Sequence, residues 1–187
     1  MVTTLLVKEL REQTGAGIME CKRALVDADG DLKKASDLLK QQGLAKAEKK
    51  LGRAANQGTI ETYVHAGGRI AAMIEINCET DFVARTQDFK TLAREVAMQV
   101  AAMNPKYLNE ASVPAEAWTE LEAEHGDHKK AAEAVCLYSQ AFIRDPKLSI
   151  DQLIRQTVAK LGENVQVTRF ARFEVGADRP ATDEAAE

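Results

Sequence analysis

Few side chains in this sequence have both the type and the spacing that catalytic or metal chemistry requires. The run DADGD, residues 27–31, alternates carboxylates as the first half of a calcium-binding loop does. Its glycine comes too early, however, and Leu38 stands where the loop needs a bidentate glutamate. The run is therefore interpreted as a turn at Asp29-Gly30, followed by Asp31 as the N-cap of a helix.

The other candidates for metal, nucleotide or nucleophile chemistry are also incomplete. His125 and His128 have no neighbours in the sequence that would complete a metal site. Gly15 and Gly17 follow a predicted helix rather than a strand, and a dinucleotide-binding loop would need a third glycine where Glu20 stands. There is no P-loop motif, and no serine or cysteine stands in a recognisable nucleophile motif. We predict a protein without metal, cofactor or enzymatic chemistry of its own.

One segment instead has the properties of a binding site. The run EINCETDFVAR, residues 75–85, begins as a strand and then places Thr80-Asp81, a pair typical of turns and helix starts, before Phe82 and Val83. Aromatic residues make up only 5% of the chain, and this one is expected to face water. The pattern alone also allows Phe82 to lie in the core beneath the sheet, with Asp81 as a helix N-cap.

The N-terminal part of the chain is predicted to be helical. A helix capped by Thr3 or Thr4 breaks at residues 14–17, a second runs from about Ile18 to Ala28, and a third begins after Asp31 and ends at Gly43. Residues 1–43 should therefore form a three-helix domain. Residues 44–56 are basic and are predicted to be a linker with a solvated face, or with a weak phosphate-contacting role. Its basic side chains are Lys46, Lys49, Lys50 and Arg53.

The rest of the chain, residues 57–176, is predicted to be an α+β core with a small antiparallel sheet packed against helices. The alternation of apolar and polar residues predicts two strands joined by a turn at residues 66–68. The first strand has Ile60, Thr62 and Val64 on one face, and the second has alternate residues from Ile70 to Ile76 on one face. A periodic helix follows and ends at Asn104-Pro105. Further helices are expected at 113–125, at 128–143 and from a capping box at 149–152 to Leu161, then a strand at 165–175 and a disordered tail at 177–187.

Composition limits the class of protein. The 187 residues carry a net charge of −4 with a pI near 5.5, which argues against a generally basic nucleic-acid-binding surface. No run approaches the roughly 18 apolar residues of a membrane span, and the N-terminus resembles neither a signal nor a transit peptide. Three widely spaced cysteines are not a disulfide framework. We expect a cytoplasmic protein.

Three long motifs carry a resemblance to a known family. They are LREQTGAGIMECKRAL at residues 10–25, EINCETDFVAR at 75–85 and AKLGENVQVTRFARFEVG at 159–176. Their content and order are similar to those of the elongation factor Ts family, the nucleotide exchange factors of the translational GTPase elongation factor Tu. The resemblance spans residues 1–176 and is weak between about 104 and 145. It implies a translation elongation factor that promotes GDP release and carries out no chemistry itself.

The resemblance also implies which residues bind the GTPase. Phe82 would wedge between partner helices near the magnesium and phosphate site, Asp81 would contact the same region, and Thr80 and Val83 would shape the tip. The N-terminal domain resembles the ubiquitin-associated type and would grip a helix of the partner. Its candidate contacts are Arg11, Ile18, Met19 and Lys22. Neighbours on a short helix point about 100° apart, so Ile18 and Met19 should not both be buried, although one of them could be.

The length of the chain resembles the short form of the family. That form implies a homodimer joined through residues 57–175, with one GTPase per chain, which an exposed apolar sheet or helix face would support. Trp118, Tyr138 and Phe142 are interpreted as packing residues. The alternatives are a general protein-binding module, which leaves the tip unexplained, an RNA-binding accessory using the basic linker, and a hydrolase or metalloenzyme.

Overall fold

The structure is a computed structural model that describes residues 2–177. The predicted disordered tail lies outside the described residues, apart from its first residue, Ala177. The chain divides into two compact units, each assembled from three stretches of sequence. The first unit comprises Met1–Gly58, Asn77–Phe89 and Asp151–Gln166, and the second comprises Thr59–Ile76, Lys90–Ile150 and Val167–Glu187.

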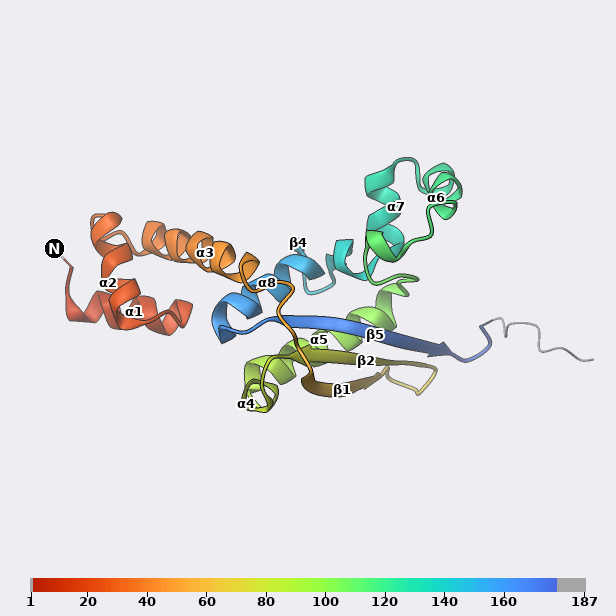
Figure 1. The fold of residues 1–187 in the computed structure, drawn as a ribbon, viewed down its shortest axis with the longest axis horizontal. Helices are drawn as coiled ribbons and strands as arrows, with labels where there is room; N and C mark the ends of the chain where they lie inside the picture. Colours follow the sequence, from red (N-terminus) through yellow and green to blue (C-terminus); the bar gives the residue numbers. More distant parts are fainter. Residues whose placement is uncertain (1, 178–187) are drawn as a thin grey trace, which may run out of the picture. The chain divides into compact units, whose positions relative to one another are not determined.

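The predicted N-terminal three-helix bundle is confirmed (Figure 1). Its helices are α1 (Thr4–Thr14), α2 (Ile18–Asp27) and α3 (Leu32–Glu48). The Thr3 hydroxyl caps α1 by accepting from the Leu6 N–H, and the Asp31 carboxylate caps α3 by accepting from the Lys34 N–H at 3.0 Å. This second bond lowers the pKa of Asp31. The apolar side chains between the helices are Leu10, Cys21, Leu25, Ala35 and Leu39.

The prediction that Gly43 ends the third helix is wrong, because α3 continues to Glu48. A Cβ atom at Gly43 would lie 3.2 Å from the Cβ of Ala159 in helix α8 (Ile150–Leu161). The glycine therefore serves the close approach of two helices rather than a helix end. The first residues of the predicted linker are consequently helical, and only the segment between α3 and β1 is irregular.

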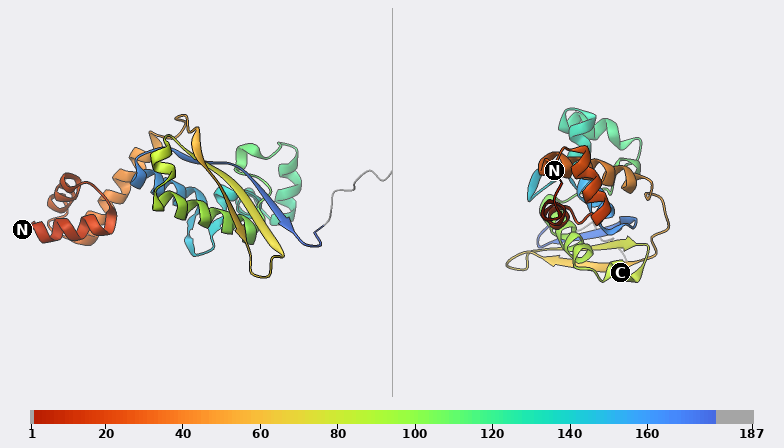
Figure 2. Two further views of the ribbon diagram at one scale, coloured as in Figure 1. Left: turned by 90° about the horizontal axis from the view of Figure 1, so that it is seen from below. Right: turned by 90° about the vertical axis from the view of Figure 1, so that its left-hand side faces the viewer.

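The predicted antiparallel sheet is also confirmed. Its strands β1 (Gln57–Val64), β2 (Ile70–Cys78) and β5 (Val165–Glu174) are arranged in the order β1-β2-β5. Helix α5 (Gln87–Met103) runs along one face of the sheet (Figure 2). Arg94 of α5 forms an ion pair with Glu61 of β1, and the Arg172 Nε of β5 donates to the Ala101 carbonyl at 2.9 Å. Alternate residues of β2 and the inner positions of α5 are buried in the core, which makes the fold α+β.

The opposite face of the sheet carries several exposed apolar side chains, beside polar ones that include the Glu75–Arg169 ion pair. Successive residues of a strand point to opposite faces of the sheet. Ile60 and Val64 therefore point away from the face of Glu61, Met73 away from the face of its buried neighbours, and Phe173 away from the face of Arg172. We call these four residues (Ile60, Val64, Met73 and Phe173) the outer sheet face. Their side chains are between 46% and 69% exposed. The prediction that Ile60, Thr62 and Val64 share one face of the strand is correct, and the structure shows that this face points away from α5.

The helices predicted at 113–125 and 128–143 are both shorter than expected. The structure has α6 (Ala117–His125) and α7 (His128–Val135), with the 3₁₀ turns η1 (Glu110–Ser112) and η2 (Leu137–Ser139) beside them. Residues predicted to continue α7 instead form β3 (Ala141–Phe142), which pairs with β4 (Asp145–Ser149).

The buried side chain of Gln99 holds the backbone of Ala141 and Ile143, which the sequence predicted to be helical, in another conformation. Its amide nitrogen donates to the Ala141 carbonyl at 3.1 Å, and its amide oxygen accepts from the Ile143 N–H at 3.0 Å. It also donates to the side chain of Gln140, which is itself fully buried. These bonds satisfy backbone groups that a helix would otherwise have paired internally. The Gln99–Gln140 pair therefore stabilises strand β3 and the turn after it, in a segment whose local sequence favours a helix.

The packing roles predicted for three aromatic residues differ in detail. Phe142 is buried, and Trp118 packs against a small cluster that includes Leu121 and Val135. The Tyr138 hydroxyl accepts from the Val167 N–H at 2.9 Å and so connects η2 to β5. All three aromatics therefore serve the packing of the second unit.

The stability of the α6–α7 segment is expected to depend on pH through His128. The centroid of the His128 ring lies 4.1 Å from that of the Trp118 ring. The Glu122 carboxylate lies 2.8 Å from the His128 Nδ1 and raises the pKa of His128 above the ordinary 6.5. The Glu110 carboxylate raises this pKa further. The stabilisation is therefore present below pH 6.5 and is lost as the pH rises through the raised folded-state value.

Thermal unfolding monitored by Trp118 fluorescence should show a small fall in melting temperature between about pH 6 and about pH 8. Trp118 is the only tryptophan of the sequence, so the signal reports this segment. The variant His128→Gln should lose the pH dependence. A fall of the same size in that variant would assign the titration to another group.

Candidate functional site

The segment after strand β2 forms a short helical tip whose one fully exposed side chain is Phe82. Helix α4 (Asp81–Ala84) begins directly after Thr80, whose hydroxyl accepts from the Val83 N–H at 3.4 Å and so caps the helix. We call residues 80–84 the tip. Asp81 is the first helical residue rather than the N-cap, so the alternative assignment of Asp81 as N-cap is wrong. Its carboxylate forms an ion pair with Arg85 at 2.8 Å.

Phe82 is 78% exposed, so the expectation that it faces water is confirmed. The alternative in which it lies in the core with Phe89 is wrong, because only Phe89 of the two is buried. The Thr86 hydroxyl accepts from the Phe89 N–H and thereby starts α5 in the direction that buries Phe89. The chain therefore presents one aromatic ring to the core and the other to solvent.

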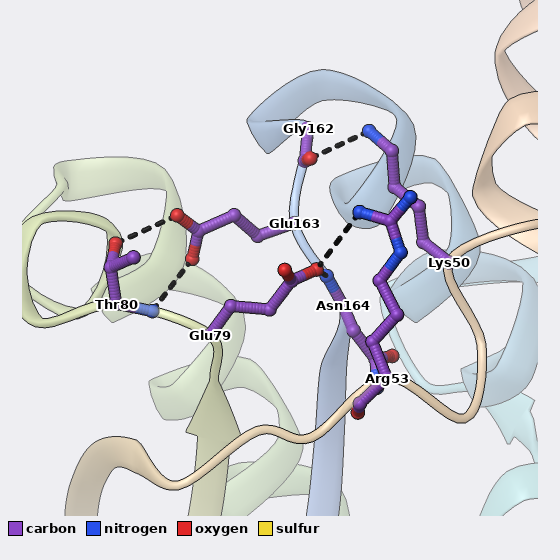
Figure 3. Close-up of polar contacts among 7 residues, drawn as sticks. All are labelled: Lys50, Arg53, Glu79, Thr80, Gly162, Glu163 and Asn164. Atoms are coloured by element: carbon purple, nitrogen blue, oxygen red, sulfur yellow. Dashed lines mark hydrogen bonds and ion pairs between the residues drawn. The ribbon is translucent and has the colours of Figure 1, made fainter.

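The base of the tip is held by a group of polar contacts within the first unit (Figure 3). The Glu163 carboxylate accepts from both the N–H and the hydroxyl of Thr80, and the Asn164 N–H donates to the Glu79 carboxylate at 2.7 Å. The Asn164 amide also donates to the Arg53 carbonyl at 2.7 Å. Sequence reasoning did not single out Glu163 and Asn164, although two polar residues directly after the helix-ending Gly162 were a usable signal.

The cysteine at the end of β2 lies inside this base. Burial raises the pKa of the Cys78 thiol, and the Glu163 carboxylate raises it further. Its Sγ donates to the Thr80 carbonyl at 3.1 Å. Cys21 and Cys136 are likewise buried free thiols, so no cysteine is placed where it could bridge two chains.

The four candidate residues of the N-terminal domain are all exposed. Ile18 and Met19 are both exposed, so the alternative in which one of them is core is wrong. Lys22 lies one helical turn after this pair and shares their region of α2, whereas Arg11 lies in the last turn of α1.

The start of α2 is fixed by Glu20. Its carboxylate accepts from the Gly17 N–H at 3.2 Å and pairs with Lys46 of α3. The pair with Lys46, followed by the bond from Gly17, lowers the pKa of Glu20. This arrangement fixes the first turn of α2, from which Ile18 and Met19 project.

No helix in residues 2–177 combines the length and apolar character that a membrane crossing demands.

Comparison with known proteins gives a consistent result. The sequence model of the elongation factor Ts family matches residues 44–124 and 122–177. Elongation factor Ts of Syntrophomonas wolfei is 50% identical over 94% of this chain and 91% of its own length. Those of Caldanaerobacter subterraneus and Carboxydothermus hydrogenoformans are each 46% identical over 94% of this chain, and over 98% and 90% of their own lengths. The chain therefore belongs to the elongation factor Ts family of translation elongation factors, as the three motifs indicated.

Proposed function

We propose that this chain is a cytoplasmic guanine-nucleotide exchange factor that binds elongation factor Tu in its GDP form. The tip enters the GTPase near its magnesium and phosphate site, GDP leaves, and GTP rebinds. The factor supplies binding energy and no chemistry of its own. The observation that carries this proposal is the 78% exposed Phe82 on a capped helix, in a chain of this family.

The physical logic of the tip is displacement of the groups that hold GDP. Its phosphates are bound by Mg²⁺ and by backbone N–H groups, so a small movement of the GTPase loops removes several charge-assisted contacts together. Each loss of about 1.4 kcal/mol raises the dissociation constant of GDP tenfold. An aromatic ring suits this role, because it supplies contact area with only two side-chain torsions to fix.

The N-terminal domain, which we take to be of the ubiquitin-associated type, provides a second contact with the GTPase. Ile18 and Met19 form an exposed apolar pair at the start of α2, with Lys22 one turn further along α2 and Arg11 in the last turn of α1. Such a surface suits an amphipathic partner helix, and the flexible methionine can adapt to its side chains. These four residues would contribute affinity, while the tip would act on the nucleotide.

We also propose that two chains pair through the outer sheet face. All three strands contribute an apolar side chain to this face, whereas an antiparallel sheet with one face on its core usually places polar side chains on the other. A second copy offers the same apolar residues, so an isologous dimer would cover both faces at once. Each chain of the dimer would keep its own tip for one GTPase.

The alternative of RNA binding through the basic segment is less favoured by the contacts. Lys50 donates to the Gly162 carbonyl at 2.6 Å, and Arg53 lies 3.7 Å from Glu79. Two of the basic side chains that could reach a phosphate therefore have partners within the protein.

Reciprocal linkage tests the proposed function. A factor that weakens GDP binding must itself be bound more weakly when GDP is present. Calorimetric titration of this chain into nucleotide-free elongation factor Tu should give an affinity at least about tenfold higher than titration into the form saturated with GDP and Mg²⁺. Equal affinities would contradict nucleotide exchange and leave a binding module.

A further inference from the structure

The tip is attached to the rest of the first unit by a two-pronged contact from Glu163. One carboxylate oxygen accepts from the Thr80 N–H at 2.9 Å, and the other accepts from the Thr80 hydroxyl at 2.7 Å. Both distances are in the range of charge-assisted hydrogen bonds. Figure 3 shows the two bonds converging on Thr80 from the segment that follows α8.

This contact has a direct effect on the start of α4. The Thr80 hydroxyl has one proton, and donating it to Glu163 leaves the lone pairs of its oxygen to accept from the Val83 N–H. The carboxylate therefore fixes the side-chain torsion of Thr80 and the cap of α4 together. Because α4 has only four residues, it has little other stabilisation of its own.

Glu163 is itself held in place from both sides. Gly162 ends α8 in the left-handed region with φ of 80°, a conformation that glycine adopts without strain, and its N–H donates to the Val158 carbonyl at 2.9 Å. Asn164 is 1% exposed and bonds to Glu79 and Arg53. The carboxylate thus projects from a loop with little freedom to move.

We propose that Glu163 is the positioning residue of the exchange reaction, holding α4 so that Phe82 meets the GTPase in one fixed direction. The inference rests on the proposed function. A tip fixed before binding does not lose conformational freedom on insertion, so more of its binding energy acts on the nucleotide site. Glu163 acts through Thr80, and its effect is therefore on the orientation of the tip.

The kinetic test compares Glu163→Ala with the wild-type chain in release of fluorescent GDP from elongation factor Tu. The maximal rate at saturating factor should fall about tenfold, the change that loss of about 1.4 kcal/mol produces. The half-saturating concentration should change much less, because the N-terminal contacts remain. Glu48→Ala is the matched control, since it removes a glutamate of the same unit that pairs with Arg155 of α8. A change confined to the half-saturating concentration would overturn the proposal.

A double-mutant cycle separates positioning from a general loss of stability. If Glu163 acts by directing Phe82, then Glu163→Ala should have little further effect in a Phe82→Ala background. Fully additive losses would overturn the proposal. In Glu163→Gln the amide can accept from only one Thr80 donor, so an intermediate rate is expected.

Amide hydrogen exchange of the free chain tests the same contact without the GTPase. The amides of residues 83–86 are bonded within the tip and its following turn. Their exchange should accelerate about tenfold in Glu163→Ala and stay unchanged in Glu48→Ala. Unchanged exchange at residues 83–86 would overturn the positioning role. If the wild-type chain failed to accelerate GDP release, the proposed function would fail separately, and this measurement would still decide whether Glu163 holds the tip.

Discussion

Replacing Phe82 with alanine is expected to lower the maximal rate of GDP release from elongation factor Tu about 100-fold, equivalent to about 2.7 kcal/mol. The ring is 78% exposed in the free chain, so its removal opens no cavity. The free energy of unfolding should therefore change by less than about 0.5 kcal/mol. Stopped-flow release of a fluorescent GDP analogue gives the rate, and thermal unfolding of the same preparation shows that the variant is folded.

Met103→Ala is a suitable control, because it truncates another partly exposed apolar side chain, 45% exposed, at the end of α5. It should leave the rate of GDP release unchanged. If Phe82→Ala released GDP as fast as the wild-type chain, Phe82 would not be the wedge. Asp81 and the N-terminal surface would then be the next residues to test.

Replacing Phe173 with aspartate is expected to convert the proposed dimer to a monomer. The side chain is 69% exposed in the single chain, so the aspartate remains solvated there. In the dimer it would be buried against apolar side chains of the second copy, and an unpaired buried carboxylate costs several kcal/mol. Sedimentation equilibrium of the two proteins measures the change directly.

Leu5→Asp provides the matched control for this experiment. Leu5 is 76% exposed on α1 and is not part of the outer sheet face, so the same charge there should leave the dimer intact. A wild-type chain that sediments as a monomer would contradict pairing through the outer sheet face. A Phe173→Asp variant that remains dimeric would place the interface elsewhere.

Local sequence patterns were sufficient where an element is stabilised by its own residues. Asp31 caps α3 as the sequence predicted, and alternation along residues 70–76 identified the buried face of β2. In both cases the deciding residues are within a few positions of one another. The exposure of Phe82 is different, because the local pattern also allowed a core position and the resemblance to the family made exposure the expectation.

The errors arose where a distant part of the chain determines the local conformation. A glycine is typical of a helix end, and the sequence around Gly43 was interpreted in that way. The structure instead places Ala159, which is far along the sequence, so close to Gly43 that a small residue is needed there. The last residues of the helix predicted through residue 143 are not helical, and the side chain of the distant Gln99 bonds to their backbone at Ala141 and Ile143. Glu163 was not recognised because its partner, Thr80, is 83 positions away. A pattern of neighbours in sequence contains no information about such pairs.

Catalysis of exchange by this chain is tested most directly by multiple turnover. Elongation factor Tu loaded with fluorescent GDP is mixed with a small substoichiometric amount of this chain and an excess of GTP. We expect each chain to release GDP from many GTPase molecules in turn. The amount of GDP released should then greatly exceed the amount of factor, and the rate of release should be proportional to the concentration of factor. Release at the spontaneous rate, or release that stops at one equivalent of factor, would contradict the claim that this chain catalyses exchange.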